Sequence, residues 1–206
     1  MRRPLLFATS NPGKLRELRA LASGLQVHSA EEVGPLPVVE ETEPTLEGNA
    51  RKKALAWARA SSLVTLADDS GLFVDALQGR PGVHSARYAP GDDAARVRRL
   101  LEELRDVPLA ARSAAFRCCL CLAAPSGQTV VETGSCQGAI SLEPRGAEGF
   151  GYDPVVLIPE LQRTLGELSL AEKSRLSHRA RAFAQMRPWL SAYGAGLWPE
   201  QGTLPP

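Results

Sequence analysis

The stretch that decides the fold reads LVTLADDSGLFVD and covers residues 63–75. Its first five residues are aliphatic or β-branched, which predicts a buried strand. Two adjacent carboxylates, Asp68 and Asp69, then interrupt the apolar run before Gly71. Neighbouring side chains at a strand end point to opposite sides, so only one Asp can face a given cleft. Burying both charges requires a metal ion or strong donors nearby. The alternative is a solvated turn that contains two Asp residues.

A second polar stretch follows the short apolar strand expected at residues 5–8. It reads TSNPGK at residues 9–14 and precedes a helix with Leu at positions 15, 18 and 21. A strand, a Gly loop and a helix start often hold phosphate, because the helix offers N–H groups and partial positive charge. Ala8 and Leu15 stand where an ATPase-type loop needs its first Gly and its magnesium-binding hydroxyl. The loop is therefore no P-loop, and any metal must be held by carboxylates elsewhere. An ordinary strand-to-helix turn is the alternative.

The remaining pattern predicts helices with parallel-type strands at the start and a hairpin later, which indicates a mixed sheet. Residues 31–48 form an acidic, Pro-rich segment that includes Glu41, which by itself indicates a solvated loop. Thr45 is expected to cap a helix over 46–60 that places Asn49 and Lys53 on one face. We expect a helix at 92–104, a hairpin of 116–122 with 129–131, a strand at 138–142 and a strand at 155–158. A capping box of Ser169 and Glu172 predicts a last helical region, which Pro188 should disturb or end.

The composition predicts one domain. We expect a single two-lobed domain over residues 1–193 and a frayed tail over 194–206. The 206 residues carry a formal net charge of +1, which indicates neither nucleic acid nor membrane binding. No segment approaches the length of a membrane span, so we expect a soluble, cytoplasmic protein. Cys118, Cys119, Cys121 and Cys136 have no zinc-type or redox-type spacing and are expected to be buried thiols.

With these residues assembled, the chain resembles the inosine triphosphate pyrophosphatase family, also called the Ham1 family, from Phe7 to about Arg187. Seven blocks carry the resemblance, in the family's order. They are TSNPGK at 9–14, EET at 40–42, Asn49-Ala50 with Lys53, ADDSGL at 67–72, Pro81-Gly82 with SARY at 85–88, GFGYDP at 149–154, and EKS at 172–174 with SHR at 177–179. One departure is Gly48, where relatives commonly carry a Glu; here Glu47 stands one residue earlier.

The resemblance implies a fold and an activity. The expected fold is α/β (mixed α+β), with an elongated mixed sheet flanked by helices and two lobes that enclose a nucleotide cleft. The expected protein is a homodimer that uses Mg²⁺. Its expected activity is hydrolysis of deaminated purine nucleoside triphosphates (ITP, dITP and XTP) to the monophosphate and pyrophosphate, which clears the nucleotide pool.

The resemblance also implies roles for individual residues. The triphosphate side would be formed by Thr9, Ser10, Asn11, Gly13, Lys14 and Lys53. Glu41 and Asp69 would bind the metal, with Asp69 also acting as the base. The nucleoside side would be lined by Ser70, Phe150, Gly151, Tyr152, Asp153, Lys173, His178 and Arg179. Because Lys173, His178 and Arg179 are donors, they would favour a 6-oxopurine over adenine.

Two other hypotheses remain open at the level of sequence. One is a related nucleotide pyrophosphatase that acts on modified pyrimidine triphosphates, as in the Maf family. The other is a nucleotide sensor without turnover, which the intact Asp69 argues against.

Overall fold

The structure is a computed structural model that describes residues 3–198. The chain divides into two compact units. Unit 1 holds the residues up to Asp69, residues 118–134, and the residues from Arg179 onward. Unit 2 holds residues 70–117 and 135–178. The residues expected on the triphosphate side therefore belong to unit 1, and those expected on the nucleoside side belong to unit 2, except for Arg179.

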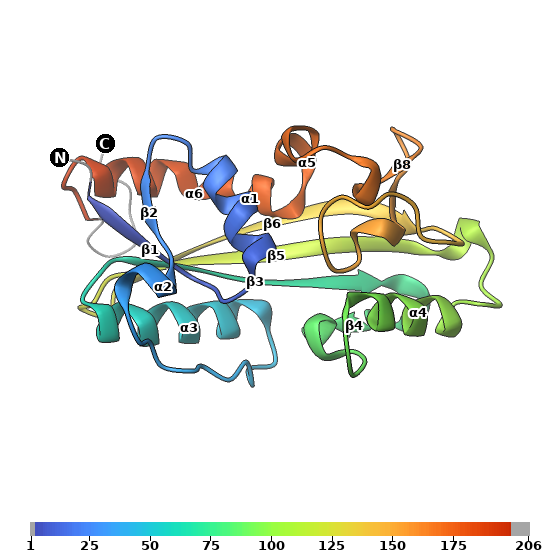
Figure 1. Cartoon of the computed structure of the whole chain (residues 1–206), viewed down its shortest axis with the longest axis horizontal. Coiled ribbons are helices and arrows are strands. Elements are labelled where there is room, and N and C mark those ends of the chain that lie inside the picture. Colours follow the sequence, from blue (N-terminus) through green and yellow to red (C-terminus); the bar gives the residue numbers. More distant parts are fainter. Residues whose placement is uncertain (1–2, 199–206) are drawn as a thin grey trace. The chain divides into compact units, whose positions relative to one another are not determined.

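Strands and α-helices are interspersed along the first half of the chain, whereas the second half has four strands in succession followed by two α-helices (Figure 1). The strands are β1 (Pro4–Ala8), β2 (Gln26–His28), β3 (Thr65–Val74), β4 (Pro81–Gly82), β5 (Ser113–Ala123), β6 (Thr129–Ile140), β7 (Val156–Ile158) and β8 (Arg163–Thr164). The α-helices are α1 (Pro12–Leu21), α2 (Ala30–Val33), α3 (Leu46–Ser61), α4 (Asp93–Glu103), α5 (Leu170–Leu176) and α6 (His178–Gly194).

The strands of the described residues form one eight-stranded sheet in the order β2-β1-β3-β5-β6-β7-β8, with β4 paired to β3. Strand β1 pairs in parallel with β2 and β3, whereas β7 pairs antiparallel with β6 and β8. The sheet is therefore mixed, as expected from the sequence. Helices flank it, which confirms the α/β (mixed α+β) fold class.

The core of unit 1 has two faces because side chains alternate along its strands. On one face, Leu5 and Phe7 of β1 pack with residues of α1 and α6, and on the other face Leu6 and Ala8 pack with Ala-rich α3. Strand β5 alternates in the same way, with Cys118 on the first face and Cys119 on the second. Helices α1 and α6 accordingly lie on one side of β1 and β3, and α3 lies on the other (Figure 1).

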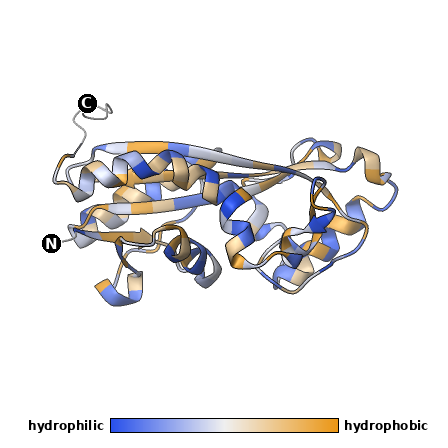
Figure 2. Cartoon of the chain, turned by 90° about the horizontal axis from the view of Figure 1, so that it is seen from above, coloured by the Kyte–Doolittle hydropathy of each residue, from blue (hydrophilic) through white to orange (hydrophobic). Residues whose placement is uncertain are grey.

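Unit 2 has its own core, formed by α4, the 3₁₀ turns and the strand segments of that unit. Val97 and Leu100 of α4 pack there with Leu72, Phe116 and Val156. The helices of both units carry hydrophobic and hydrophilic residues side by side (Figure 2). This pattern is typical of helices that bury one face and expose the other.

Several helix starts agree with the sequence. Thr45 caps α3 by accepting a hydrogen bond from the Gly48 N–H (3.0 Å), and Asp92 caps α4 in the same way. Ser169 and Glu172 form the predicted capping box at α5. The four cysteines are buried thiols, as expected. None of the helices in the described part of the chain has the length and apolarity to cross a membrane.

Two expectations about local structure were wrong, and for a third the structure excludes one of the two expected outcomes. The predicted separate strand at 138–142 is instead the end of β6, which runs without a break to Ile140. The run from 65 does not end at the two Asp residues, since β3 continues to Val74. Pro188 lies within α6 and does not end it. Proline has no N–H to donate to the Ala184 carbonyl. Because Pro188 and Ala184 are both exposed, water can donate to that carbonyl instead. Buried Met186 and Trp189 hold the helix to the core.

Residues 194–198, the first part of the expected tail, have defined contacts. Helix α6 reaches Gly194, and the Leu197 N–H donates to the Ala192 carbonyl (2.9 Å). The ring of Trp198 meets that of Tyr193 edge-on. The expectation for residues 199–206 lies outside the described residues.

Candidate active site

The parallel register of β1 and β3 brings the two polar stretches together. Ala8 pairs with Ala67, so the next residues along the chain, Thr9 and Asp68, lie at the same height along the two parallel strands. Thr9 Oγ1 accepts a hydrogen bond from the Asn11 N–H (3.0 Å), and Asn11 Oδ1 caps α1 by accepting from the Lys14 N–H (3.0 Å). The loop therefore has a fixed path into α1. Gly13 is buried, whereas Ser10 and Asn11 are exposed at the helix start.

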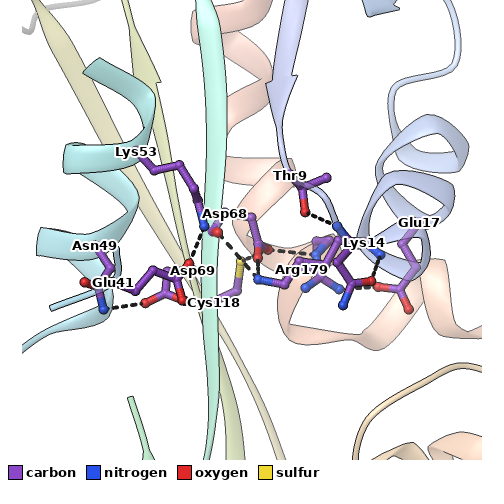
Figure 3. A network of polar contacts seen from close by, with 11 residues as sticks. Thr9, Lys14, Glu17, Glu41, Asn49, Lys53, Asp68, Asp69, Cys118 and Arg179 are labelled. Atoms are coloured by element: carbon purple, nitrogen blue, oxygen red, sulfur yellow. Dashed lines mark hydrogen bonds and ion pairs between the residues drawn. The ribbon is translucent and has the colours of Figure 1, made fainter. Parts of the chain in front are cut away.

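Asp68 lies at the centre of a buried charge network on the α1 and α6 face (Figure 3). Asp68 stands two residues after Leu66 in β3, so its side chain points to the same face of the sheet, on which Leu66 packs. Its carboxylate pairs with the Lys14 ammonium, accepts from Arg179 Nε (2.8 Å), and accepts from the Cys118 thiol (3.2 Å). Arg179 also pairs with Glu17 of α1. Two cations and two anions thus balance one another inside unit 1.

The charges in this network set the protonation of its members. Burial disfavours the ionised form of Asp68, but Arg179 and Lys14 outweigh burial and hold the pKa of Asp68 well below its usual range. Burial likewise lowers the pKa of Lys14, but Asp68 outweighs it, so that the pKa of Lys14 is raised overall. Lys14 is therefore a fixed positive charge beside the start of α1.

Asp69 faces the opposite side of β3, toward α3 (Figure 3). Its Oδ2 accepts a hydrogen bond from Asn49 Nδ2 (3.0 Å), and only 4% of the residue is exposed. Burial raises the pKa of Asp69 to about 6; Lys14 opposes this shift and the charge of Glu41 adds to it. A solvated turn would leave both carboxylates exposed, so this alternative is wrong.

The acidic segment also reaches this site, because Asn49 holds it there. The Glu43 N–H donates to Asn49 Oδ1 (2.9 Å), while Asn49 Nδ2 reaches Asp69. Glu41 Oε1 accepts from the Lys53 ammonium (2.5 Å), one turn along α3 from Asn49. Glu41 is therefore not a side chain of a merely solvated loop. The structure brings together Glu41, Lys53 and Asp69.

Close packing explains why position 48 carries a glycine. A Cβ at this position would lie 2.7 Å from the Glu43 Cβ, so the acidic segment fills the space of a side chain. Glu47, the acidic residue one position earlier, is exposed and pairs with Arg51 (2.8 Å).

Glu41 and Asp69 are the groups that fit a magnesium ion. No cluster of three or more His, Cys, Asp or Glu side chains within residues 3–198 is arranged as a metal site. Mg²⁺, however, commonly takes one or two carboxylates together with water and substrate phosphate oxygens. The two carboxylates are close enough for the charge of Glu41 to raise the pKa of Asp69. Their oxygen chemistry and their mutual repulsion fit a small divalent cation.

In unit 2, the GFGYDP stretch presents Phe150 between two glycines. Lys173 Nζ pairs with the buried Asp153 carboxylate and lies 5.1 Å from the Phe150 ring centroid. Asp153 Oδ2 also accepts from the Phe150 N–H (2.8 Å). The structure therefore brings together four of the residues expected on the nucleoside side: Phe150, Gly151, Asp153 and Lys173.

Tyr152 and His178 have internal contacts in the same unit. The Tyr152 hydroxyl donates to the Ser85 carbonyl (2.9 Å), and burial raises the pKa of Tyr152. Tyr152 is a core residue of unit 2. His178 stacks on the Phe116 ring with 4.6 Å between centroids. Ser70 is the first residue of unit 2 and continues β3.

Arg179 has a different setting from the one that we expected. It belongs to unit 1, is 1% exposed, and is engaged by Asp68 and Glu17. These contacts indicate that Arg179 stabilises the carboxylate that holds Lys14. That Arg179 also selects the base stays a hypothesis beside this structural role.

Sequence reasoning missed Glu17 and Cys118. Glu17 is 4% exposed on α1 and pairs with a residue 162 positions away. Its position immediately before the buried Leu18 was the available signal, because an acidic residue on an apolar helix face needs a cation. No local signal points from Cys118 to Asp68.

Comparisons with known proteins identify the family. Residues 5–189 match the family described as the Ham1 family. The chain is 44% identical over 189 residues to a protein named dITP/XTP pyrophosphatase from Halalkalibacterium halodurans, covering 90% of this chain and 97% of that protein. It is 46% identical to a protein of the same name from Geobacter sulfurreducens, covering 92% and 98%.

Solved structures are also similar. The structure of a HAM1 protein from Coxiella burnetii has a TM-score of 0.82 and 38% identity, covering 92% of this chain and 98% of that one. A nucleoside-triphosphatase / dITP/XTP pyrophosphatase from Mycobacterium abscessus has a TM-score of 0.71 and 44% identity, covering 90% and 99%. Fold and sequence agree, and the chain belongs to the Ham1 family.

Proposed function

We propose that this protein hydrolyses deaminated purine nucleoside triphosphates (ITP, dITP and XTP) to the nucleoside monophosphate and pyrophosphate. The names of its relatives support the substrate class. The observation that carries the proposal is the partly buried cluster of Glu41, Lys53 and Asp69 beside Lys14. This cluster combines a tuned carboxylate with cations that suit phosphate.

Asp69 is the proposed general base. A pKa of about 6 leaves this carboxylate mostly ionised at neutral pH while making it a stronger base than an exposed Asp. It accepts a proton from the attacking water as the water oxygen bonds to the α-phosphorus. The bond from that phosphorus to the bridging oxygen breaks, and pyrophosphate leaves. Asn49 holds the carboxylate through a hydrogen bond of 3.0 Å.

The lysines bind and orient the triphosphate. Lys14 is held by Asp68 and Lys53 by Glu41, so neither ammonium must be ordered when substrate arrives. Thr9, Ser10, Asn11 and Gly13 form the loop and helix start that receive phosphate oxygens. Mg²⁺, held by Glu41 and Asp69, would stabilise negative charge on the phosphate oxygens.

The nucleoside is assigned to unit 2. The Phe150 ring offers a face for the purine, and Lys173 offers a donor for a 6-oxo group. A site built around such a donor disfavours adenine, whose amino group leaves it unpaired. Ser70, Gly151, Asp153 and His178 complete this side, with Tyr152 supporting it from the core. We also propose that the protein is cytoplasmic and that it forms a homodimer. Sedimentation can test the homodimer.

The test is a product assay over ITP, dITP, XTP, ATP and pyrimidine triphosphates, with Mg²⁺ supplied or chelated. We expect monophosphate and pyrophosphate from the 6-oxopurines, dependent on Mg²⁺. Turnover confined to pyrimidine triphosphates, or tight ITP binding without product, would contradict the proposal.

A further inference from the structure

The loop that presents Phe150 is tied to a helix that none of the family blocks includes. The Gly151 N–H donates to Asp93 Oδ2 at 2.7 Å, across 58 residues of sequence. Asp93 is the first residue of α4, and its other oxygen pairs with Arg96. Asp93 therefore connects α4 to the residue immediately after Phe150.

The backbone of this loop needs such support. Gly149 and Gly151 have φ of +80° and +64°, a region that other L-residues rarely adopt. A Cβ at Gly149 would lie 2.0 Å from Asp153 Oδ2, whereas one at Gly151 would meet nothing within 4 Å. Gly149 is thus fixed by close packing, while Gly151 has open space at its Cα. Glycine also has the largest conformational freedom in an unconstrained loop.

Two consecutive backbone amides of the Phe150 loop (residues 149–153) each donate a hydrogen bond to a different carboxylate. The Phe150 N–H donates to Asp153 within the loop, and the Gly151 N–H donates to Asp93 from α4. The first contact depends on residues that also hold Lys173. The second reaches a helix whose Val97 and Leu100 are buried in the unit 2 core. Asp93 thus links the loop that carries the Phe150 ring to α4, a helix that is packed in the unit 2 core.

We propose that Asp93 is a positioning residue for Phe150, fixing the ring against which the purine of the substrate stacks. This inference rests on the proposed function for its effect on substrate, but not for the contact itself. Base stacking on an aromatic ring contributes enough to binding that its partial loss is measurable. Asp93 touches no reacting atom, so its loss should act on substrate binding more than on the chemical step.

The test compares Asp93→Ala and Asp93→Asn with Asp92→Asn as the matched control. Asp92 is also acidic and lies at the same end of α4, but it caps the helix through the Ala95 N–H (2.8 Å), a bond that Asn can also form. In Asp93→Ala we expect the Gly151 amide to exchange hydrogen at least about tenfold faster by NMR, because its acceptor is gone. Asp92→Asn should match the wild type, and Asp93→Asn, which keeps a neutral acceptor, should fall between.

The kinetic arm measures ITP hydrolysis by the same variants. We expect Asp93→Ala to raise KM at least about fivefold with kcat within about twofold. Unchanged Gly151 exchange in Asp93→Ala would overturn the tether, and faster exchange with unchanged KM would overturn the positioning role. If the wild type does not hydrolyse ITP, the proposed function fails, yet the exchange arm still decides whether Asp93 holds the loop.

Discussion

Asp68 and Asp69 are neighbours in β3, yet their carboxylates face different helices and have opposite pKa shifts. Asp68 lies against Lys14 and Arg179, which keep its pKa low, whereas Asp69 lies against Asn49 and near Glu41, where burial raises its pKa to about 6. The alternation of a strand therefore separates a structural anion from a proposed base at adjacent positions.

Replacing the proposed base should remove most activity and preserve the fold. Asp69→Asn keeps the size of the side chain and its contact with Asn49, but an amide is neither a base nor a charged ligand. We expect ITP hydrolysis to fall by about 10²- to 10⁴-fold. Glu47→Gln makes the same chemical change at an exposed position of α3 and should leave the rate unchanged. Near-normal turnover of Asp69→Asn would remove Asp69 from the mechanism.

The same variant should be more stable than the wild type at high pH without metal. The folded pKa of Asp69, about 6, lies above its ordinary value of 3.8, so the folded state binds this proton more tightly. Stability from this group is present below about pH 4 and is lost as pH rises to about 6. With a chelator, Asp69→Asn should exceed the wild type by roughly 2–3 kcal/mol in free energy of unfolding at pH 8 and match it at pH 4. Equal denaturation midpoints at both pH values would contradict the shift.

Removing the other proposed metal ligand should weaken the response to magnesium. Glu41→Gln deletes one carboxylate of the pair, so the Mg²⁺ concentration for half-maximal ITP hydrolysis should rise at least about tenfold. Glu43→Gln is the control, since the Glu43 side chain approaches only the half-buried Lys52 (3.7 Å) among the ion pairs of the described residues. A magnesium curve that Glu41→Gln leaves unmoved would exclude Glu41 as a ligand.

Arg179 should matter for stability before it matters for substrate choice. Arg179→Ala leaves Asp68 and Glu17 buried without their shared cation, which typically costs about 3–5 kcal/mol. Thermal unfolding should show this loss, and the rates with ITP and ATP should fall together because Lys14 loses its fixed position. Arg187→Ala, on the exposed side of α6, should change neither. If Arg179→Ala keeps the wild-type Tm and narrows the ratio of ITP to ATP turnover, Arg179 contacts the base instead.

Local patterns predicted much of the fold because they report on local physics. Thr45 and Ser169 were identified as helix caps from their own neighbours, and β1 and β3 from their apolar runs. The continuation of β3 through two charges was missed, since pairing with β1 and the cations around Asp68 outweigh the poor strand preference of Asp. Pro188 does not end α6, because buried Met186 and Trp189 hold the helix around it.

The site was predictable only in part. Glu41, Lys53 and Asp69 could be grouped by family resemblance, and the structure brings them together. The partners of Arg179 could not, because Asp68 lies 111 residues away in sequence. The contact of Asp93 with Gly151 is likewise a product of tertiary packing, with no periodicity that would indicate it.

The most direct measurement of the central claim is hydrolysis of ITP in water enriched in ¹⁸O, followed by mass spectrometry of both products. If Asp69 activates water for attack at the α-phosphorus, one ¹⁸O atom should appear in IMP and none in pyrophosphate. Asp69→Asn should slow the formation of IMP and of pyrophosphate alike. Label in pyrophosphate, or formation of IDP with labelled orthophosphate, would contradict the account, because attack would then occur at the β- or γ-phosphorus.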